Sequence, residues 1–147
     1  MENELKNVIN NHNVTLFTGR FFRGKSWIIS KLEDFLVVDK RESFMRGDTA
    51  ILAEEELKEI ENSFRIAIDE AQIMDHEQLE WILNHVLRER KVLVISCRNY
   101  EYIDYLEIFE KSKLNECHFA HVEMKNWDEE TKSPIDFKID RSTHSFS

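Results

Sequence analysis

The chain has 147 residues, of which 41% are hydrophobic and 33% charged, and a formal net charge of −9 at pH 7. This length suits one core-bearing domain, and this composition suits a soluble globular protein rather than a disordered one. No apolar run approaches the ~18 residues of a membrane-spanning helix, and the acidic balance disfavours a dedicated nucleic-acid binder. Because the polar N-terminus lacks the apolar stretch of a secretion signal, we expect a cytoplasmic protein without a membrane partner.

A phosphate-binding loop is predicted near the start of the chain. A β-rich run at residues 14–18 ends at Gly19, and apolar residues at helical spacing predict a helix over 25–34. Between them the sequence GRFFRGKS has the spacing G-x-x-x-x-G-K-S, which binds phosphate where a strand passes into a helix. A turn that only reverses the chain would not need the Lys and Ser that follow, so we favour phosphate binding.

This loop predicts a set of nucleotide contacts. Its backbone N–H groups and the start of the following helix would face the phosphates of ATP, with Lys25 at the β- and γ-phosphates and Ser26 as a ligand of Mg²⁺. The predicted nucleotide-binding residues are Gly19, Arg20, Phe21, Phe22, Arg23, Gly24, Lys25 and Ser26. ATP and Mg²⁺ are therefore the expected cofactors.

An acidic pair is predicted at the end of a later strand. The pattern indicates a strand at 35–39, a polar loop, a helix at 53–62 and a strand at 64–70. The last strand delivers Asp69 and Glu70 at its carboxyl end, where ligands collect in an open α/β sheet. Asp69 would support Mg²⁺ through a water molecule, and Glu70 would orient and polarise the attacking nucleophile. A solvated strand end is the alternative interpretation.

The second half of the chain predicts a helix at 76–90, a strand at 91–96, a helix at 102–112 and a strand at 117–124. The strand at 91–96 is expected between the loop strand and the acidic strand, where Ser96 and Asn99 would sense the γ-phosphate and Arg98 would stabilise charge. Turn-forming and surface roles are the alternatives. Cys97 and Cys117, each placed in a strand, are expected to pack as small apolar residues in a reducing compartment.

The sequence CHFAH contains Cys117, His118 and His121, which are residue types that bind metal ions, but their spacing disfavours a metal site. On a strand, Cys117 and His121 would share a face but stand ~13 Å apart, and His118 would point the other way. We therefore expect no zinc site in this run.

These elements predict one three-layer α/β domain of the P-loop NTPase type over residues 1–126, with a mainly parallel five-stranded sheet and helices on both faces. Residues 127–147 are expected to form a C-terminal appendage. The alternation of Ile135, Phe137 and Ile139 predicts an edge strand there, followed by a disordered tail.

The order of these motifs resembles the nucleotide-binding core of the type II thymidine kinases. The resemblance is closest in GRFFRGKS, where that family carries a Phe at the place of Phe22, and in IDEAQIM; more loosely it extends over residues 14–124. It implies that Lys25 and Ser26 hold ATP and Mg²⁺ and that Glu70 is the base for a nucleoside 5′-hydroxyl. The chain lacks the zinc-binding insert and the lasso loop of that family, and it has SCRNYEY in place of a Gly-Leu-Asp-type loop. The resemblance thus extends to the ATP half of the site and not to the nucleoside half.

Three functions remain open at this point. The Asp-Glu-Ala-Gln run also occurs in RecA-like ATPases, so the leading expectation is a Mg-ATP-binding NTPase that hydrolyses ATP slowly, with Lys25 and Glu70 as catalytic residues and Ser26 and Asp69 at the metal. A nucleoside kinase with a reduced acceptor pocket is the second. The third is a nucleotide-dependent binding or regulatory module, such as a virus-encoded one, with negligible turnover. Nucleotide is the expected ligand, and a homo-oligomer that borrows an arginine from its neighbour is compatible with the sequence.

Overall fold

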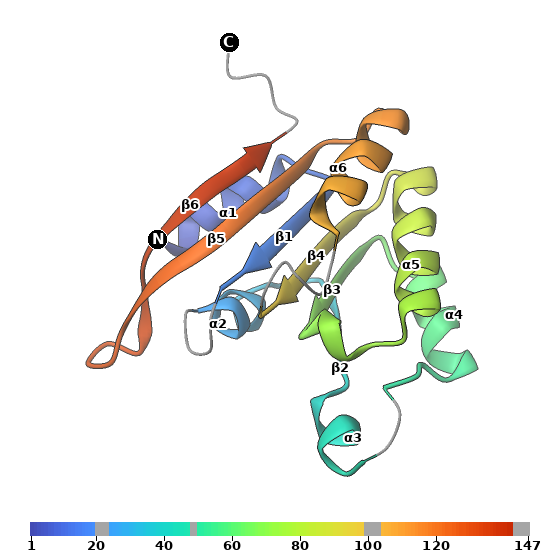
Figure 1. The fold of residues 1–147 in the computed structure, drawn as a ribbon, viewed down its shortest axis with the longest axis horizontal. Coiled ribbons are helices and arrows are strands. Elements are labelled where there is room, and N and C mark those ends of the chain that lie inside the picture. Colours follow the sequence, from blue (N-terminus) through green and yellow to red (C-terminus); the bar gives the residue numbers. More distant parts are fainter. Residues whose placement is uncertain (20–23, 48–49, 99–103, 143–147) are drawn as a thin grey trace.

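The computed structural model describes residues 1–19, 24–47, 50–98 and 104–142 (Figure 1). Its elements in chain order are α1 (Glu2–Asn10), β1 (Val14–Thr18), α2 (Lys25–Ser30), β2 (Leu36–Asp39), α3 (Arg41–Met45), α4 (Glu54–Asn62), β3 (Arg65–Asp69), the 3-10 turn η1 (Ala71–Ile73), α5 (His76–Glu89), β4 (Val92–Cys97), α6 (Tyr105–Leu114), β5 (Phe119–Asp128) and β6 (Ser133–Ser142). Residues 143–147, at the end of the predicted appendage, lie outside the described residues, so the predicted disorder of the final residues stays a prediction.

The strands form one mixed sheet in the order β2-β3-β4-β1-β5-β6. Neighbours from β2 to β5 pair in parallel, whereas β6 runs antiparallel to β5. The described sheet therefore has six strands, and the prediction of five was wrong, because the alternating segment of the appendage pairs along β5. The expected place of β4 between β1 and β3 is confirmed. The predicted division of the chain after residue 126 falls inside β5.

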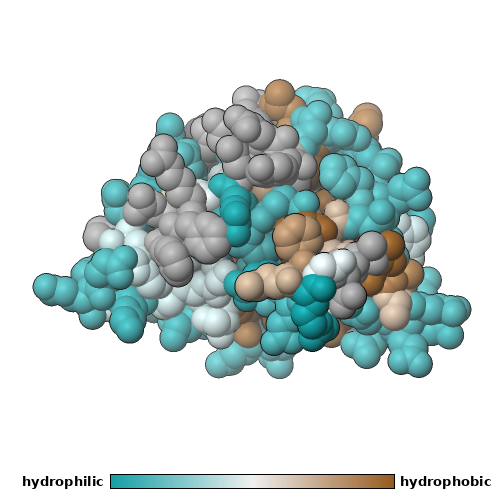
Figure 2. All heavy atoms as spheres, turned by 60° about the horizontal axis from the view of Figure 1, so that its bottom comes forward, coloured by the Kyte–Doolittle hydropathy of each residue, from teal (hydrophilic) through white to brown (hydrophobic). Residues whose placement is uncertain are grey.

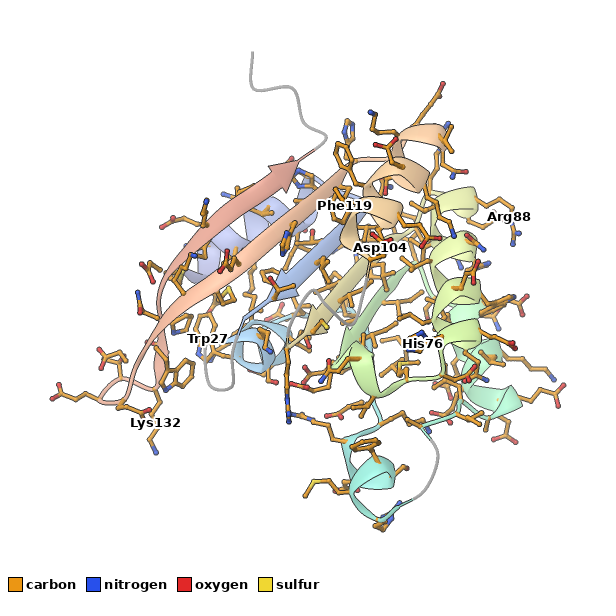
Figure 3. The ribbon with its side chains drawn as sticks, viewed as in Figure 1. Trp27, His76, Arg88, Asp104, Phe119 and Lys132 are labelled. Carbon is orange, nitrogen blue, oxygen red and sulfur yellow. The ribbon has the colours of Figure 1, made fainter. Side chains whose placement is uncertain are left out.

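Helices cover both faces of this α/β sheet. One hydrophobic core joins the sheet to α4, α5 and α6, and a second core joins the opposite face to α1 and α2. Within β1, Val14 and Leu16 belong to the first core and Phe17 to the second, as the two-residue alternation of a strand requires. The ring of Phe119 packs edge-on against Phe109 of α6, with centroids 6.0 Å apart (Figure 3).

Two helices were not predicted from the sequence. In α1, Leu5 and Ile9 are one helical turn apart and are fully or almost fully buried against the sheet, which contributes about 1.5–3 kcal/mol for each side chain. The short helix α3 replaces part of the expected polar loop and has no buried residue. It therefore lacks the apolar periodicity that would reveal a helix.

Both cysteines are buried thiols that form no disulfide among the described residues, and their burial confirms that they pack as small apolar residues. Cys97 ends β4, but β5 begins only at Phe119, so the placement of Cys117 within a strand was wrong. Burial raises the pKa of the Cys117 thiol. Among the described segments, no helix is both long and apolar enough to cross a membrane.

Gly24 lies where the start of α2 meets the β5–β6 ribbon. Its φ is +99°, and a Cβ placed on it would come within 2.8 Å of Pro134 Cβ and 3.3 Å of Met124 Cε. A side chain at this position would therefore both strain the backbone and collide with the ribbon.

Gly24→Ala is expected to lower the free energy of unfolding by about 2–4 kcal/mol, because backbone strain adds to the collision with Pro134. Gly47→Ala is the matched control: φ there is +83°, but no described atom lies within 4 Å of its added Cβ. Strain alone should cost about 1 kcal/mol at Gly47. Urea unfolding of both variants measures the difference, and equal losses would contradict the packing argument.

Candidate functional site

The candidate site lies at the carboxyl edge of the sheet. Because β1 to β4 run in parallel, their carboxyl ends meet at one edge, next to α2 and α3 (Figure 1). Figure 2 brings this side of the molecule forward and shows apolar atoms gathered among polar ones.

The Asp69 carboxylate is the centre of the polar contacts at this edge. Its Oδ1 accepts hydrogen bonds from the Ser26 hydroxyl at 3.2 Å and from the Ser96 hydroxyl at 2.6 Å. Its Oδ2 pairs with Nη2 of Arg41 at 3.2 Å. Asp69 is 4% exposed, so these groups replace the water that the carboxylate loses on folding.

Asp39 and Arg41 were not predicted as site residues. Asp39 is the register partner of Asp69 on the adjacent parallel strand. The Arg41 guanidinium contacts Asp39 Oδ2 at 2.6 Å and Ser26 Oγ at 3.4 Å. This hydrogen-bonded guanidinium lowers the pKa of Asp39, and Asp39 in turn raises the pKa of Arg41.

The Lys25 ammonium is directed to the carbonyl of Gly19, at 2.7 Å from Nζ. The residue is only 4% exposed, although it carries a charge. Burial lowers the pKa of Lys25, and the nearby Glu70 carboxylate opposes that shift. An anion placed beside this ammonium would compensate for its lost hydration.

Glu70 is held in a constrained geometry. Its φ of +56° and ψ of +54° place a residue with a full side chain in the left-handed region. Its backbone N–H donates to the Ser96 hydroxyl at 2.8 Å. Its Oε2 accepts a hydrogen bond from the Gln72 amide and lies 3.5 Å from Nε of Arg98.

A cavity of about 710 Å³ opens beside Glu70. It is bounded by two arginines, a carboxylate, an amide and three apolar side chains: Arg41, Arg98, Glu70, Gln72, Phe44, Met45 and Ile73. Phe44 and Met45 are 54% and 85% exposed, so α3 offers them to whatever enters the cavity.

Most of the predicted site residues that the structure describes lie close together. Ser26 and Ser96 donate hydrogen bonds to Asp69, whereas the Lys25 ammonium contacts the Gly19 carbonyl, with the Glu70 carboxylate near enough to oppose the fall of its pKa. Arg98 lies at Glu70 rather than on a separate surface. The predicted residues Arg20, Phe21, Phe22, Arg23 and Asn99 lie outside the described residues. The position of Asp39 at the end of the second strand was the one signal for the missed carboxylate.

The CHFAH run does not converge on one point. The His121 imidazole Nε2 forms a hydrogen bond of 2.7 Å with the Thr18 hydroxyl inside the sheet, whereas His118 is exposed and the Cys117 thiol faces the carbonyl of Leu87 at 3.4 Å. Within the described part of the chain, no group of three or more His, Cys, Asp or Glu side chains is arranged to hold a metal ion.

Comparisons with known proteins add little. No family model matches the chain, and no curated protein matches it. A solved structure from Pyrococcus horikoshii OT3, described as the structural study of a numbered project, is similar over 86% of this chain and 89% of its own, at 10% sequence identity and a TM-score of 0.41.

Ser96→Ala is expected to lower the free energy of unfolding by about 2 kcal/mol, because it removes a donor to buried Asp69 and leaves the N–H of Glu70 without its acceptor. Ser112→Ala is the matched control, since Ser112 is equally buried but donates only to the carbonyl of Ile108 within α6. Its loss should be less than half as large. The argument fails if urea unfolding ranks the two variants in the opposite order.

Proposed function

We propose that this chain is a P-loop nucleotide-binding protein that takes Mg-ATP at the carboxyl edge of its sheet and hydrolyses it slowly. The observation that carries the proposal is the 3.2 Å contact between the Ser26 hydroxyl and the Asp69 carboxylate. These residues are 43 positions apart and were each expected at the metal, from separate motifs. If the glycine spacing had arisen by chance, contact between the residue that follows it and the acidic end of another strand would not be expected.

The donor set suits Mg²⁺. This ion prefers oxygen ligands and is commonly held by one or two protein groups, with phosphates and water completing its shell. The Ser26 hydroxyl and the Asp69 carboxylate supply such oxygens, and the Arg41 cation that lies against both indicates that positive charge is favoured there. Bound Mg²⁺ would neutralise charge on the β- and γ-phosphates. The absence of a three-residue cluster in the described segments is compatible with this mode of binding.

The remaining residues have distinct roles in phosphoryl transfer. Lys25 would exchange its contact with the Gly19 carbonyl for a phosphate oxygen, and the backbone from Gly24 to Ser26 would face the phosphates. Glu70 would orient a water molecule and accept its proton as the water oxygen bonds to the γ-phosphorus. The bond from that phosphorus to the β,γ-bridging oxygen breaks, and ADP leaves with the electron pair. Gln72 and Arg98 hold the Glu70 carboxylate at the cavity.

A kinase activity is the second candidate, and the cavity beside Glu70 favours it. A volume of about 710 Å³ exceeds what one attacking water needs and lies in the usual range for small-molecule sites. The apolar side chains Phe44, Met45 and Ile73 would contact the body of a hydroxyl-bearing acceptor such as a nucleoside, and Glu70 would take the proton of its hydroxyl.

The variants Asp69→Asn and Glu70→Gln are expected to fail differently. Asp69→Asn removes charge at the metal and should weaken Mg-nucleotide binding, which calorimetry with Mg-ADP measures. Glu70→Gln keeps the size of the side chain but loses its basic oxygen, so binding should persist while ATP turnover falls by about 10²- to 10⁴-fold. Glu77→Gln, an exposed position on α5, is the control that changes charge equally and should alter neither measurement.

The same assay separates the candidate functions. ADP release that does not depend on any added nucleoside, and that Glu70→Gln abolishes, supports hydrolysis. Acceptor-dependent release that Phe44→Ala reduces would replace hydrolysis by kinase activity. Nucleotide binding without turnover would leave a binding or regulatory module, and no heat with ATP or ADP at millimolar concentration would overturn the proposal altogether.

A further inference from the structure

Arg41 contacts both oxygen groups assigned to the metal, Ser26 and Asp69, and also the neighbouring carboxylate of Asp39. Its Nη2 lies 2.6 Å from Asp39 Oδ2 and 3.2 Å from Asp69 Oδ2, and its Nη1 lies 3.4 Å from the Ser26 hydroxyl. Its Nε adds contacts of 3.0 and 3.1 Å to the two oxygens of Asp39. One guanidinium thus bridges two strands and the start of α2.

The register of the sheet explains why a cation is required at this place. Asp39 and Asp69 are partners on neighbouring parallel strands, so two carboxylates of like charge stand side by side. Asp69 is almost completely buried, and its Oδ1 is already occupied by two serine hydroxyls. Arg41 therefore neutralises a pair of anions that would otherwise repel each other.

We propose that Arg41 competes with Mg²⁺ for Asp69 and Asp39, so that the metal enters efficiently only together with a nucleotide. This inference rests on the proposed function and concerns the regulation of the same site. A metal ion alone must displace the guanidinium and leave it unpaired. Metal that arrives with a nucleotide supplies phosphate oxygens, with which an arginine pairs well.

The surroundings of Arg41 allow it to leave the carboxylates. Its side chain is 46% exposed, and α3, which begins at this residue, buries none of its side chains. Arg41 also borders the 710 Å³ cavity, which offers space for the displaced guanidinium. Its movement would therefore break ion pairs without breaking core contacts.

The competition has a thermodynamic consequence. Because the guanidinium penalises metal binding more in the absence of nucleotide than in its presence, it contributes to the coupling between the two ligands. Removing the guanidinium should increase the affinity for the metal alone. It should also reduce the further increase in metal affinity that the nucleotide causes.

Mn²⁺ serves as the probe, and electron paramagnetic resonance measures its free concentration in titrations with and without ADP. Arg41→Gln should bind Mn²⁺ alone about tenfold more tightly than the parent protein, since one nearby positive charge is lost. Arg41→Lys keeps the charge and should bind Mn²⁺ as weakly as the parent protein. If the Gln variant does not fold, Arg41→Met removes the charge in its place and should show the same gain. Arg88→Gln is the matched control. Arg88 lies in the last turn of α5, where its side chain points outward and pairs with Glu89 (Figure 3).

Unchanged or weaker Mn²⁺ binding by Arg41→Gln would overturn the competition, as would an equal gain in Arg88→Gln, which would indicate a general effect of net charge. The ADP titrations separate this inference from the proposed function. If ADP alters Mn²⁺ binding to no variant, the nucleotide proposal fails, whether or not Arg41→Gln gains affinity for Mn²⁺ alone. If ADP tightens Mn²⁺ binding equally in the parent and in Arg41→Gln, nucleotide binding stands and the competition fails.

Discussion

The buried carboxylate of Asp69 is the constraint on which the site depends. An ionised group at 4% exposure is tolerated only when hydrogen bonds and a cation replace its water. Here the partners come from three different elements: Ser26 from α2, Ser96 from β4 and Arg41 from α3. Satisfying one carboxylate therefore fixes the start of α2, the end of β4 and the start of α3 relative to one another.

The parallel arrangement of β1 to β4 makes this convergence possible. All four strands end at the same edge, so short segments that follow them in sequence become neighbours in space. The antiparallel β6 has a different role, since its Pro134 contacts the position of Gly24 at the start of α2. The C-terminal ribbon thus packs against Gly24 at the start of α2, and the glycine is required for that packing as well as for its backbone conformation.

The sequence predicted those parts of the site that depend on neighbours along the chain. The loop from Gly19 to Ser26 and the strand end at Asp69 are local patterns, and each indicates its own chemistry. The pairing of Asp39 with Asp69 depends on the register between β2 and β3, which one sequence does not encode locally. The contacts of Arg41 follow from that register. An edge strand was predicted in the C-terminal appendage, but it was not counted among the five strands of the sheet, because its pairing along β5 is likewise a tertiary contact.

The most direct test of the account is a nitrogen-15 NMR titration of the protein with Mg-ADP. Phosphate binding at the carboxyl edge predicts that the backbone amide signals of Gly24, Lys25 and Ser26 shift most, with smaller shifts at Asp69 and Glu70 through the shared hydrogen bonds. Signals in α1 and in the distal half of α5 should stay unchanged. Shifts confined to other parts of the sheet, or none at millimolar Mg-ADP, would contradict the central claim that this edge binds nucleotide phosphates.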